Sequence, residues 1–374
     1  MIKRLLKSLK REPVVRLQPK GKPRGVVAIS YILEPFVAGA DLRGHTNAFE
    51  CEQIAHAYVD LGFSVEVVDY RNRTYVPPAE TRVAIDIHSN LERWDRELAP
   101  ACRRILHATG AHWLTWNTAE FERLRAVFER RGKCLRARRT AEPSRAIEVC
   151  DKASVIGNEW TMGTFAGAGK PMHRVLLSSA YTYDWLEERD WDRARKAFVW
   201  LGSFGMVHKG LDLALEAFAR MPEYSLTVCG RPEKEGDFFE AYRSELTQCE
   251  NIRLAGWTDL ASPEFEEIRR THGGMVYPSS SEGCAGSIVH CAHAGLIPIV
   301  TRETGFDIGT FGARIERGSV DAVCEAVHRF AQTPTAELKE RARAGWEFVR
   351  QTHNRERFVR EYREFAAAVI KEVR

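Results

Sequence analysis

Features that mark several common protein classes are missing from this sequence of 374 residues. No stretch approaches the roughly 18 consecutive apolar residues of a membrane span, and the N-terminus lacks the apolar core of a signal peptide. The nine cysteines are scattered and include no Cys-x-x-Cys pair, which is typical of reduced thiols. We therefore expect a cytoplasmic protein with no membrane span, no disulfide framework and no metal site.

Motifs of several enzyme classes are also absent. No Gly-x-Ser-x-Gly elbow supports a hydrolase, and the first predicted strand runs into ISYILEPFVAGADLRG, which is not the Gly-x-Gly-x-x-Gly of a dinucleotide oxidoreductase. Asp190-Trp191-Asp192 has the form of an Asp-x-Asp metal motif, but it lies in a run of charges that indicates solvated surface. His290 and His293 lack a third ligand at a suitable spacing.

The basic residues are concentrated at the N-terminus. Nine of the 55 Lys/Arg but only one of the 51 Asp/Glu fall within residues 1–24, so the rest of the chain is net acidic and does not favour nucleic-acid binding. Ile2, Leu5, Leu6 and Leu9 have helical spacing opposite basic residues. This pattern predicts a basic amphipathic helix, so that residues 1–22 could bind an anionic membrane surface from its inner side. A solvated tail is the alternative.

The remaining sequence, with 44% hydrophobic and 28% charged residues, is that of a globular protein long enough for two domains. Apolar strand-like runs alternate with helical periodicity, which predicts parallel pairing and right-handed crossovers. In the first half the expected strands are GVVAISY, SVEVVDY, RVAIDIHS, AHWLTWN, ASVIG and RVLLSS. The expected helices are GHTNAFECEQIAHAYVDLG, the segment around LERWDRELAPACRRILHA, and residues 118–131.

The charged stretch WLEERDWDRARK marks an expected domain junction. After it, the strands AFVWLG, SLTVCG, NIRLAG, GMVY and LIPIV alternate with helices, and three amphipathic helices end the chain. We predict a basic arm (1–24), a first α/β domain (25–190), a second α/β domain (191–353) and a terminal helix (354–374).

Four strand ends in the second half carry small or polar residues. In parallel α/β sheets, ligands bind outside the carboxyl ends of the strands, and a lysine at a helix start suits a diphosphate. Each turn could also be purely structural. The four segments are GSFGMVHKG (with Ser203, Gly205 and Lys209), CGRP (with Arg231), AGWTD (with Trp257 and Thr258) and PSSSEGCAG (with Glu282).

In this order the four segments resemble the nucleotide-binding domain of retaining GT-B glycosyltransferases of the group 1, or family 4, type. RGHTNAFECEQIAHAYVDLGFSVEVVD resembles the glycine loop and first helix of the same family. The resemblance implies two facing Rossmann-like domains with parallel sheets, and a C-terminal helix that crosses back to the first domain. It also implies an enzyme of polysaccharide biosynthesis that transfers a sugar, with retention, from a nucleotide-sugar donor to a glycan or lipid-linked acceptor. No cofactor and no obligatory metal are implied.

The resemblance also implies roles for the fourth segment. Glu282 would accept hydrogen bonds from hydroxyls of the donor sugar, as an acid among residues with little bulk. The backbone amides that follow would approach the sugar and the diphosphate at a helix N-terminus; they belong to Gly283, Cys284, Ala285 and Gly286. The alternative for Glu282 is an acid that only stabilises a helix start.

Two positions depart from the family pattern. His290 stands where the family has a second Glu on the ribose, and it is either a ribose contact or an ordinary helix histidine. Ser203 stands where the family has a basic residue, so we expect Lys209 to be the main charge on the diphosphate, with Arg231 nearby. These departures leave open a non-catalytic sugar-nucleotide or glycan-binding protein; an epimerase or phosphorylase of the same fold is a further alternative.

In the first domain the positions that match the acceptor side of the family are Gly44, His45 and His88. A histidine at the carboxyl end of a strand can orient an acceptor or handle its proton. A structural role is the alternative for each. The predicted catalytic residues are therefore Glu282, Lys209 and His88.

Overall fold

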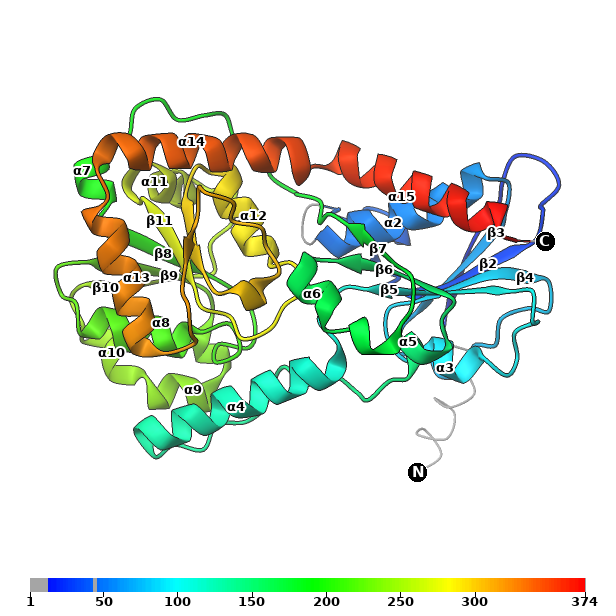
Figure 1. Ribbon diagram of the computed structural model, residues 1–374, viewed down its shortest axis with the longest axis horizontal. Coiled ribbons are helices and arrows are strands. Elements are labelled where there is room, and N and C mark those ends of the chain that lie inside the picture. Colours follow the sequence, from blue (N-terminus) through cyan, green and yellow to red (C-terminus); the bar gives the residue numbers. More distant parts are fainter. Residues whose placement is uncertain (1–12, 43–45, 374) are drawn as a thin grey trace.

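The computed structural model describes residues 13–42 and 46–373, which form two α/β domains beside one another (Figure 1). The first domain is built on a seven-stranded sheet and the second on a six-stranded sheet. Within the described residues no helix is both long and apolar enough to cross a membrane. The predicted membrane-binding helix lies outside the described residues.

The first sheet has the strand order β1-β3-β2-β4-β5-β6-β7. All pairs are parallel except β1, which joins the edge antiparallel to β3, so part of the expected arm is a strand. From β2 the chain continues to β3 on one side, and it then crosses to β4 on the other side of β2. The topological switch point therefore lies between β2 and β4. The strands are β1 (Val14–Leu17), β2 (Val26–Tyr31), β3 (Ser64–Asp69), β4 (Thr81–Asp86), β5 (Arg103–Ala108), β6 (Lys152–Ile156) and β7 (Met172–Val175).

The helices of the first domain differ greatly in length. The longest, α4, reaches beyond its own domain and runs along the second one (Figure 1). The helical segments are η2 (Glu34–Phe36), α2 (Thr46–Asp60), α3 (Asn90–Trp94), α4 (Trp113–Arg131), α5 (Ala146–Val149), α6 (Glu159–Gly163) and η3 (Ala166–Ala168).

The segment between β4 and α4 differs from its prediction. The expected helix over LERWDRELAPACRRILHA is only the short α3, and its last six residues form β5. Pro100 interrupts a helix there, since proline lacks the N–H and clashes with the preceding turn. The expected strand AHWLTWN is the start of α4, where the His112 side chain accepts a hydrogen bond from the Leu114 amide. The aromatic residues of this segment favour a strand. The segment is helical nonetheless, because it continues into α4, which buries Glu120, Arg123 and Val127 at helical spacing.

The second sheet has the order β10-β9-β8-β11-β12-β13, all parallel. Its switch point lies between β8 and β11, where one series of crossovers ends and the other begins. The strands are β8 (Ala197–Leu201), β9 (Ser225–Cys229), β10 (Ile252–Gly256), β11 (Gly274–Tyr277), β12 (Ile297–Val300) and β13 (Ala313–Arg314).

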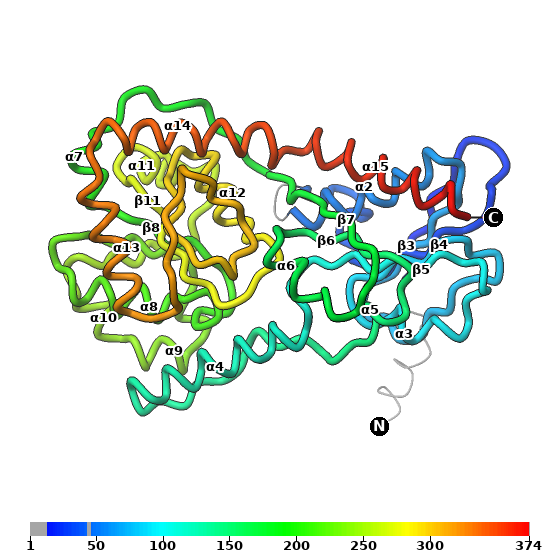
Figure 2. The backbone as a smooth tube through the Cα atoms, viewed as in Figure 1, coloured from blue at the N-terminus to red at the C-terminus, as the bar shows by residue number. Residues whose placement is uncertain are grey.

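The helices of the second domain cover both faces of its sheet, and α14 leads into α15, which crosses to the first domain (Figure 2). There α15 packs on α2, with Phe358 beside Phe49 (ring centroids 6.3 Å) and Arg363 paired with Asp60 (2.7 Å). The helical segments are α7 (Trp191–Ala194), α8 (Leu211–Ala219), η4 (Pro232–Lys234), α9 (Gly236–Ala241), α10 (Arg243–Thr247), α11 (Pro263–Thr271), α12 (Gly286–His293), η5 (Arg302–Thr304), α13 (Val320–Gln332), α14 (Thr335–Thr352) and α15 (Arg355–Lys371).

Helix α4 docks on the second domain through charged side chains. Arg123 donates to the Pro278 carbonyl (2.6 Å), and Arg130 pairs with the buried Asp212 of α8 (2.8 Å). Arg131 pairs with Glu245 of α10 (2.5 Å). The two domains are therefore joined both by α15 and by α4.

Candidate active site

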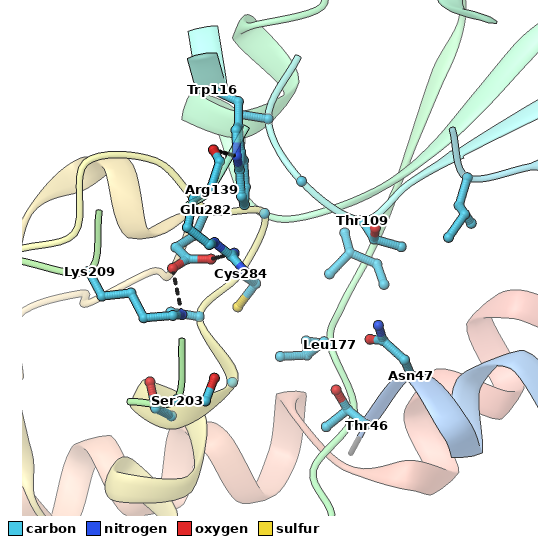
Figure 3. Close-up of a pocket in the computed structure, with 18 of the residues that line it drawn as sticks. Thr46, Asn47, Thr109, Trp116, Arg139, Leu177, Ser203, Lys209, Glu282 and Cys284 are labelled. Carbon is cyan, nitrogen blue, oxygen red and sulfur yellow. Dashed lines mark hydrogen bonds and ion pairs between the residues drawn. The ribbon is translucent and has the colours of Figure 1, made fainter. Parts of the chain in front are cut away.

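A cleft of about 720 Å³ lies between the domains, at the carboxyl ends of both sheets. Its walls include residues of the loops that follow β2, β4 and β5 in the first domain, and β8, β10 and β11 in the second. Lining residues from both domains are labelled in Figure 3. Both switch points open onto it, which is where a ligand of such sheets is expected.

Lys209 and Glu282 meet in this cleft. Lys209 follows β8 and Glu282 follows β11, so the switch point between these strands brings them together. The Lys209 ammonium lies 3.0 Å from Oε1 of Glu282 and 2.9 Å from the Tyr277 hydroxyl (Figure 3). Ser279 donates to the same Glu282 oxygen (3.3 Å). The predicted pair of residues is thus assembled at one point.

Lys209 and Glu282 each stabilise the ionised form of the other. Burial by itself raises the pKa of Glu282, but Lys209 and Arg139 outweigh burial and lower that pKa to about 2. Burial also opposes the charge of Lys209, yet the Glu282 carboxylate raises the pKa of Lys209 above its ordinary value. Both groups are therefore charged at neutral pH.

The loop after Glu282 is anchored to both domains. The amides of Glu282 and Ala285 donate to the carbonyls of Glu303 (2.8 Å) and Thr304 (3.0 Å). The Gly283 carbonyl accepts from the Thr161 hydroxyl of the first domain (2.8 Å). Ala285 lines the cleft, but its amide already has a partner within the protein, which leaves the amides of the other three predicted residues for a ligand.

The helix that follows this loop presents its N-terminus to the cleft. No side chain caps α12 at Ala285, and Gly286 and Ser287 of its first turn line the cleft. An uncapped first turn leaves backbone N–H groups for an anion. Gly283 and Cys284 line the cleft beside them.

Other predicted residues lie on the same wall. Ser203, Trp257 and Thr258 line the cleft, and Trp257 is 58% exposed. Arg231 is not a lining residue; its guanidinium lies over the Trp257 ring at 5.1 Å. His290 lines the cleft and its Nε2 accepts from the Ala180 amide (3.3 Å).

Gly205 is not where it was expected. It does not line the cleft, and its amide donates to Oε1 of the buried Glu235 (2.6 Å). Its φ of +87° requires glycine, so its role is in the turn after β8. Gly44 and His45 lie outside the described residues.

His88 lies on the first-domain wall, as predicted from the end of its strand. Its ring stacks on Tyr70 with 5.8 Å between centroids, and its Nδ1 is 3.3 Å from the Ser89 hydroxyl. Thr46 and Asn47, at the start of α2, line the cleft as well (Figure 3). This wall therefore presents polar groups to the cleft.

Arg139 was not among the residues predicted from the sequence. It belongs to the loop after α4, and its Nη2 lies 3.4 Å from Oε2 of Glu282. Its guanidinium covers the ring of Trp116, a second lining residue that was missed (4.7 Å, Figure 3). The only signal was the basic composition of the segment CLRARR, which does not say which arginine turns inward.

No metal-binding group of three or more His, Cys, Asp or Glu occurs in the described part of the chain. Asp190 caps α7 by accepting from the Arg193 amide (3.2 Å), and His293 is buried against the His353 carbonyl (2.9 Å).

Comparison with protein families identifies the second domain. Residues 195–333 match the family described as Glycosyl transferases group 1. This match shows that the second domain is similar to the group 1 glycosyltransferases. The resemblance inferred from the four strand ends is therefore confirmed, and so is the prediction of a glycosyltransferase at the level of this family. A search of curated proteins returns no match to the sequence.

Solved structures extend the similarity to most of the chain. A complex of HepE from Anabaena with UDP and glucose has a TM-score of 0.57 at 10% identity, over 92% of this chain and 99% of that one. WaaG, a glycosyltransferase involved in lipopolysaccharide biosynthesis, has a TM-score of 0.55 at 14% identity, over 90% and 98%. TarM from S. aureus has 0.51 at 11% identity, over 75% and 54%. These similarities, together with the two facing sheets, confirm the predicted GT-B fold.

Proposed function

We propose that the group 1 glycosyltransferase transfers a sugar from a nucleotide-sugar to a hydroxyl acceptor, with retention of the anomeric configuration and without a metal ion. The observation that carries this proposal is the buried Lys209–Glu282 pair beside the uncapped N-terminus of α12. The pair offers a cation for phosphates and an acceptor for sugar hydroxyls within one cleft.

In the proposed reaction, the bond between the anomeric carbon and the β-phosphate oxygen breaks, and its electron pair leaves with the nucleoside diphosphate. The acceptor oxygen forms the new bond to the same carbon, and its proton passes to the departing diphosphate or to solvent. Lys209 and the N–H groups of the first turn of α12 stabilise the charge that develops on the phosphate. Such preorganised groups are typically worth on the order of 10²–10³ in rate.

The second domain would bind the nucleotide and the first domain the acceptor, as in the family. We assign contacts with the nucleoside to Trp257 and Thr258, and contacts with the acceptor to His88, Thr46 and Asn47, because all five residues line the cleft. HepE is known in complex with UDP and glucose, so UDP-sugars come first among the candidate donors. We propose a glycan or lipid-linked glycan as acceptor, with residues 1–22 at an anionic membrane surface and no role for nucleic acid.

The test is a thermal-shift screen of the full chain with UDP, GDP, ADP and dTDP and their sugar conjugates. A ligand at 100 times its dissociation constant stabilises the folded chain by about 2.7 kcal/mol. A donor found in this way is then incubated with glycan and lipid-linked acceptors, with and without EDTA, and the product linkage is determined by NMR. Failure to bind any of these nucleotides would contradict the proposal.

The same screen separates the alternatives. Tight nucleotide binding with no turnover on any acceptor would favour a non-catalytic binding protein, which the neutral side chain of Ser203 in the cleft supports. Conversion of the donor without an acceptor would indicate an epimerase.

A further inference from the structure

The charge balance of the cleft depends on the first domain. Among the described residues that line it, Lys209 and Arg139 are the sole lysine and arginine. Lys209 is paired with Glu282 at 3.0 Å, so these two side chains together carry no net charge. Beside this pair Arg139 is the further cation, since the other lining residues with ionisable acid groups are Asp41, Glu142 and Asp259. A diphosphate, with at least two negative charges, would need such a cation next to the neutral pair.

We propose that Arg139 binds the diphosphate of the donor, so that the first domain completes the nucleotide site of the second. This inference rests on the proposed function. A guanidinium presents several N–H donors in a planar fork that matches phosphate oxygens, and it keeps its charge when partly buried. The side chain of Arg139 is 26% exposed, which leaves it open to a ligand in the cleft.

The donors of Arg139 are not used up by the protein. Its contact with Glu282, at 3.4 Å, is long for a hydrogen bond. Its Nε is buried and has no hydrogen-bond partner among the described residues. A buried donor of this kind is costly unless a ligand or water satisfies it. The guanidinium therefore has hydrogen bonds to offer to phosphate oxygens.

The backbone of Arg139 is held in place from both sides. Its amide donates to Oε1 of Glu120 (3.1 Å), and its carbonyl accepts from Nε1 of Trp116 (2.5 Å). The other oxygen of Glu120 bonds Nδ1 of His208, the residue before Lys209 (2.9 Å). Glu120 is thus a positioning residue that ties the loop of Arg139 to the loop of Lys209.

The turn after β8 makes room for Arg139. A Cβ atom at Gly205 would lie 2.3 Å from Cγ of Arg139. Ser203, in the same turn, lines the cleft with a neutral side chain. The turn after β8 therefore contributes no lysine or arginine before Lys209, and the side chain of Arg139 from the first domain occupies the space beside Gly205.

The test compares Arg139→Met with Arg138→Met. Arg138 pairs with Glu235 (3.4 Å) and with Asp237 and does not line the cleft, so it is the matched control. Binding is measured by calorimetry for whichever of UDP, GDP, ADP and dTDP binds the wild type most tightly, and for its nucleoside. We expect Arg139→Met to weaken diphosphate binding about tenfold or more, since a hydrogen bond to a charged group is lost. Nucleoside binding should not change, and Arg138→Met should bind both ligands as the wild type does.

A positive charge introduced on the second domain should restore diphosphate binding to Arg139→Met. In Arg139→Met, the second substitution Ser203→Arg places a guanidinium on the turn after β8, and we expect it to recover much of the lost affinity. Wild-type diphosphate binding by Arg139→Met would overturn the inference and leave the proposed function intact. Equal losses for the nucleoside, or in Arg138→Met, would also overturn it, because the effect would then come from the fold. A wild type that binds none of the four diphosphates would overturn the proposed function itself.

Discussion

Lys209 and Glu282 form an ion pair with little contact with water, their side chains being 11% and 9% exposed. A buried pair of this kind adds little net stability, but loss of one partner leaves the other charge uncompensated. Arg139 lies on the far oxygen of Glu282, so it still balances the carboxylate when Lys209 is removed. The two partners are therefore not equivalent.

We expect Glu282→Gln to lower the free energy of unfolding by about 3–5 kcal/mol, because it leaves two cations together. Lys209→Met should cost less, and the double variant should cost clearly less than the sum of the two. Urea denaturation of the four proteins measures this coupling, while donor turnover should be largely lost in all three variants. If the loss of stability in the double variant equalled the sum of the two single losses, the pairing of Lys209 with Glu282 would be contradicted.

Glu50 of α2 is a buried acid outside the cleft. Burial raises its pKa to about 7; the Ser178 amide donates to Oε1 (2.8 Å), and Oε2 has no partner within the described residues. Because the folded pKa lies above the ordinary value, the stability linked to this proton is present at low pH and lost as the pH rises through about 7.

Glu50→Gln should therefore raise the free energy of unfolding at about pH 8–9 by about 3 kcal/mol relative to the wild type, with little change at about pH 4, below the ordinary pKa. Melting curves across this range check it, with the more exposed Glu52→Gln as control. A constant offset between Glu50→Gln and wild type at all pH values would contradict the raised pKa.

At the scale of elements, α4 buries a polar face. Glu120, Arg123 and Val127 are buried at helical spacing, and the partners of the charged side chains lie in the second domain. Arg123 is 6% exposed and faces Asp212, which is fully buried. A charged helix face is usually exposed to solvent, whereas the charged face of α4 forms a contact between the two domains.

We expect Arg123→Ala to destabilise the protein by about 3 kcal/mol, because Asp212 loses one of its two cations and Pro278 a donor. Amide exchange along α4 should become faster. Arg125→Ala is the control: Arg125 pairs with Glu129 on the exposed side of the same helix, and its loss should cost at most about 0.5 kcal/mol. Equal effects of the two substitutions would rule out docking through Arg123.

At the scale of the whole molecule, the two domains meet at Gly283. A Cβ atom there would lie 2.4 Å from the carbonyl oxygen of Thr109 and 2.9 Å from that of Ile156, both in the first domain. Since these are backbone atoms, they cannot move aside as a flexible side chain would. The absence of a side chain at position 283 therefore allows the two domains to approach each other this closely.

Gly283→Ala should therefore hold the domains apart and abolish most turnover, while each domain remains folded. Small-angle scattering should show a larger radius of gyration, and circular dichroism should be unchanged. Gly163→Ala is the control, since a Cβ atom at that glycine meets nothing within 4 Å. A variant at Gly283 with the compactness and turnover of the wild type would contradict this contact.

Much of the architecture was predictable because its signals are local. Strand runs, helical periodicity and glycine turns each depend on a few neighbouring residues, and they indicated the second domain with Lys209 and Glu282 at its strand ends. Prediction failed over residues 90–117, where aromatic content favoured a strand at the start of α4. It also misplaced Gly205, whose amide has its partner, Glu235, in a distant loop.

The sequence by itself therefore determined the alternation of strands and helices, the family of the second domain, and the presence of a cation and an acid at one switch point. Only the tertiary structure decided that Arg139 lies beside Glu282, from which it is separated by 143 positions in the sequence. It also decided that the charged face of α4 is buried. The physical reason is that contacts between domains depend on how two folded bodies dock, and a charge pattern looks the same whether it faces water or an opposite charge.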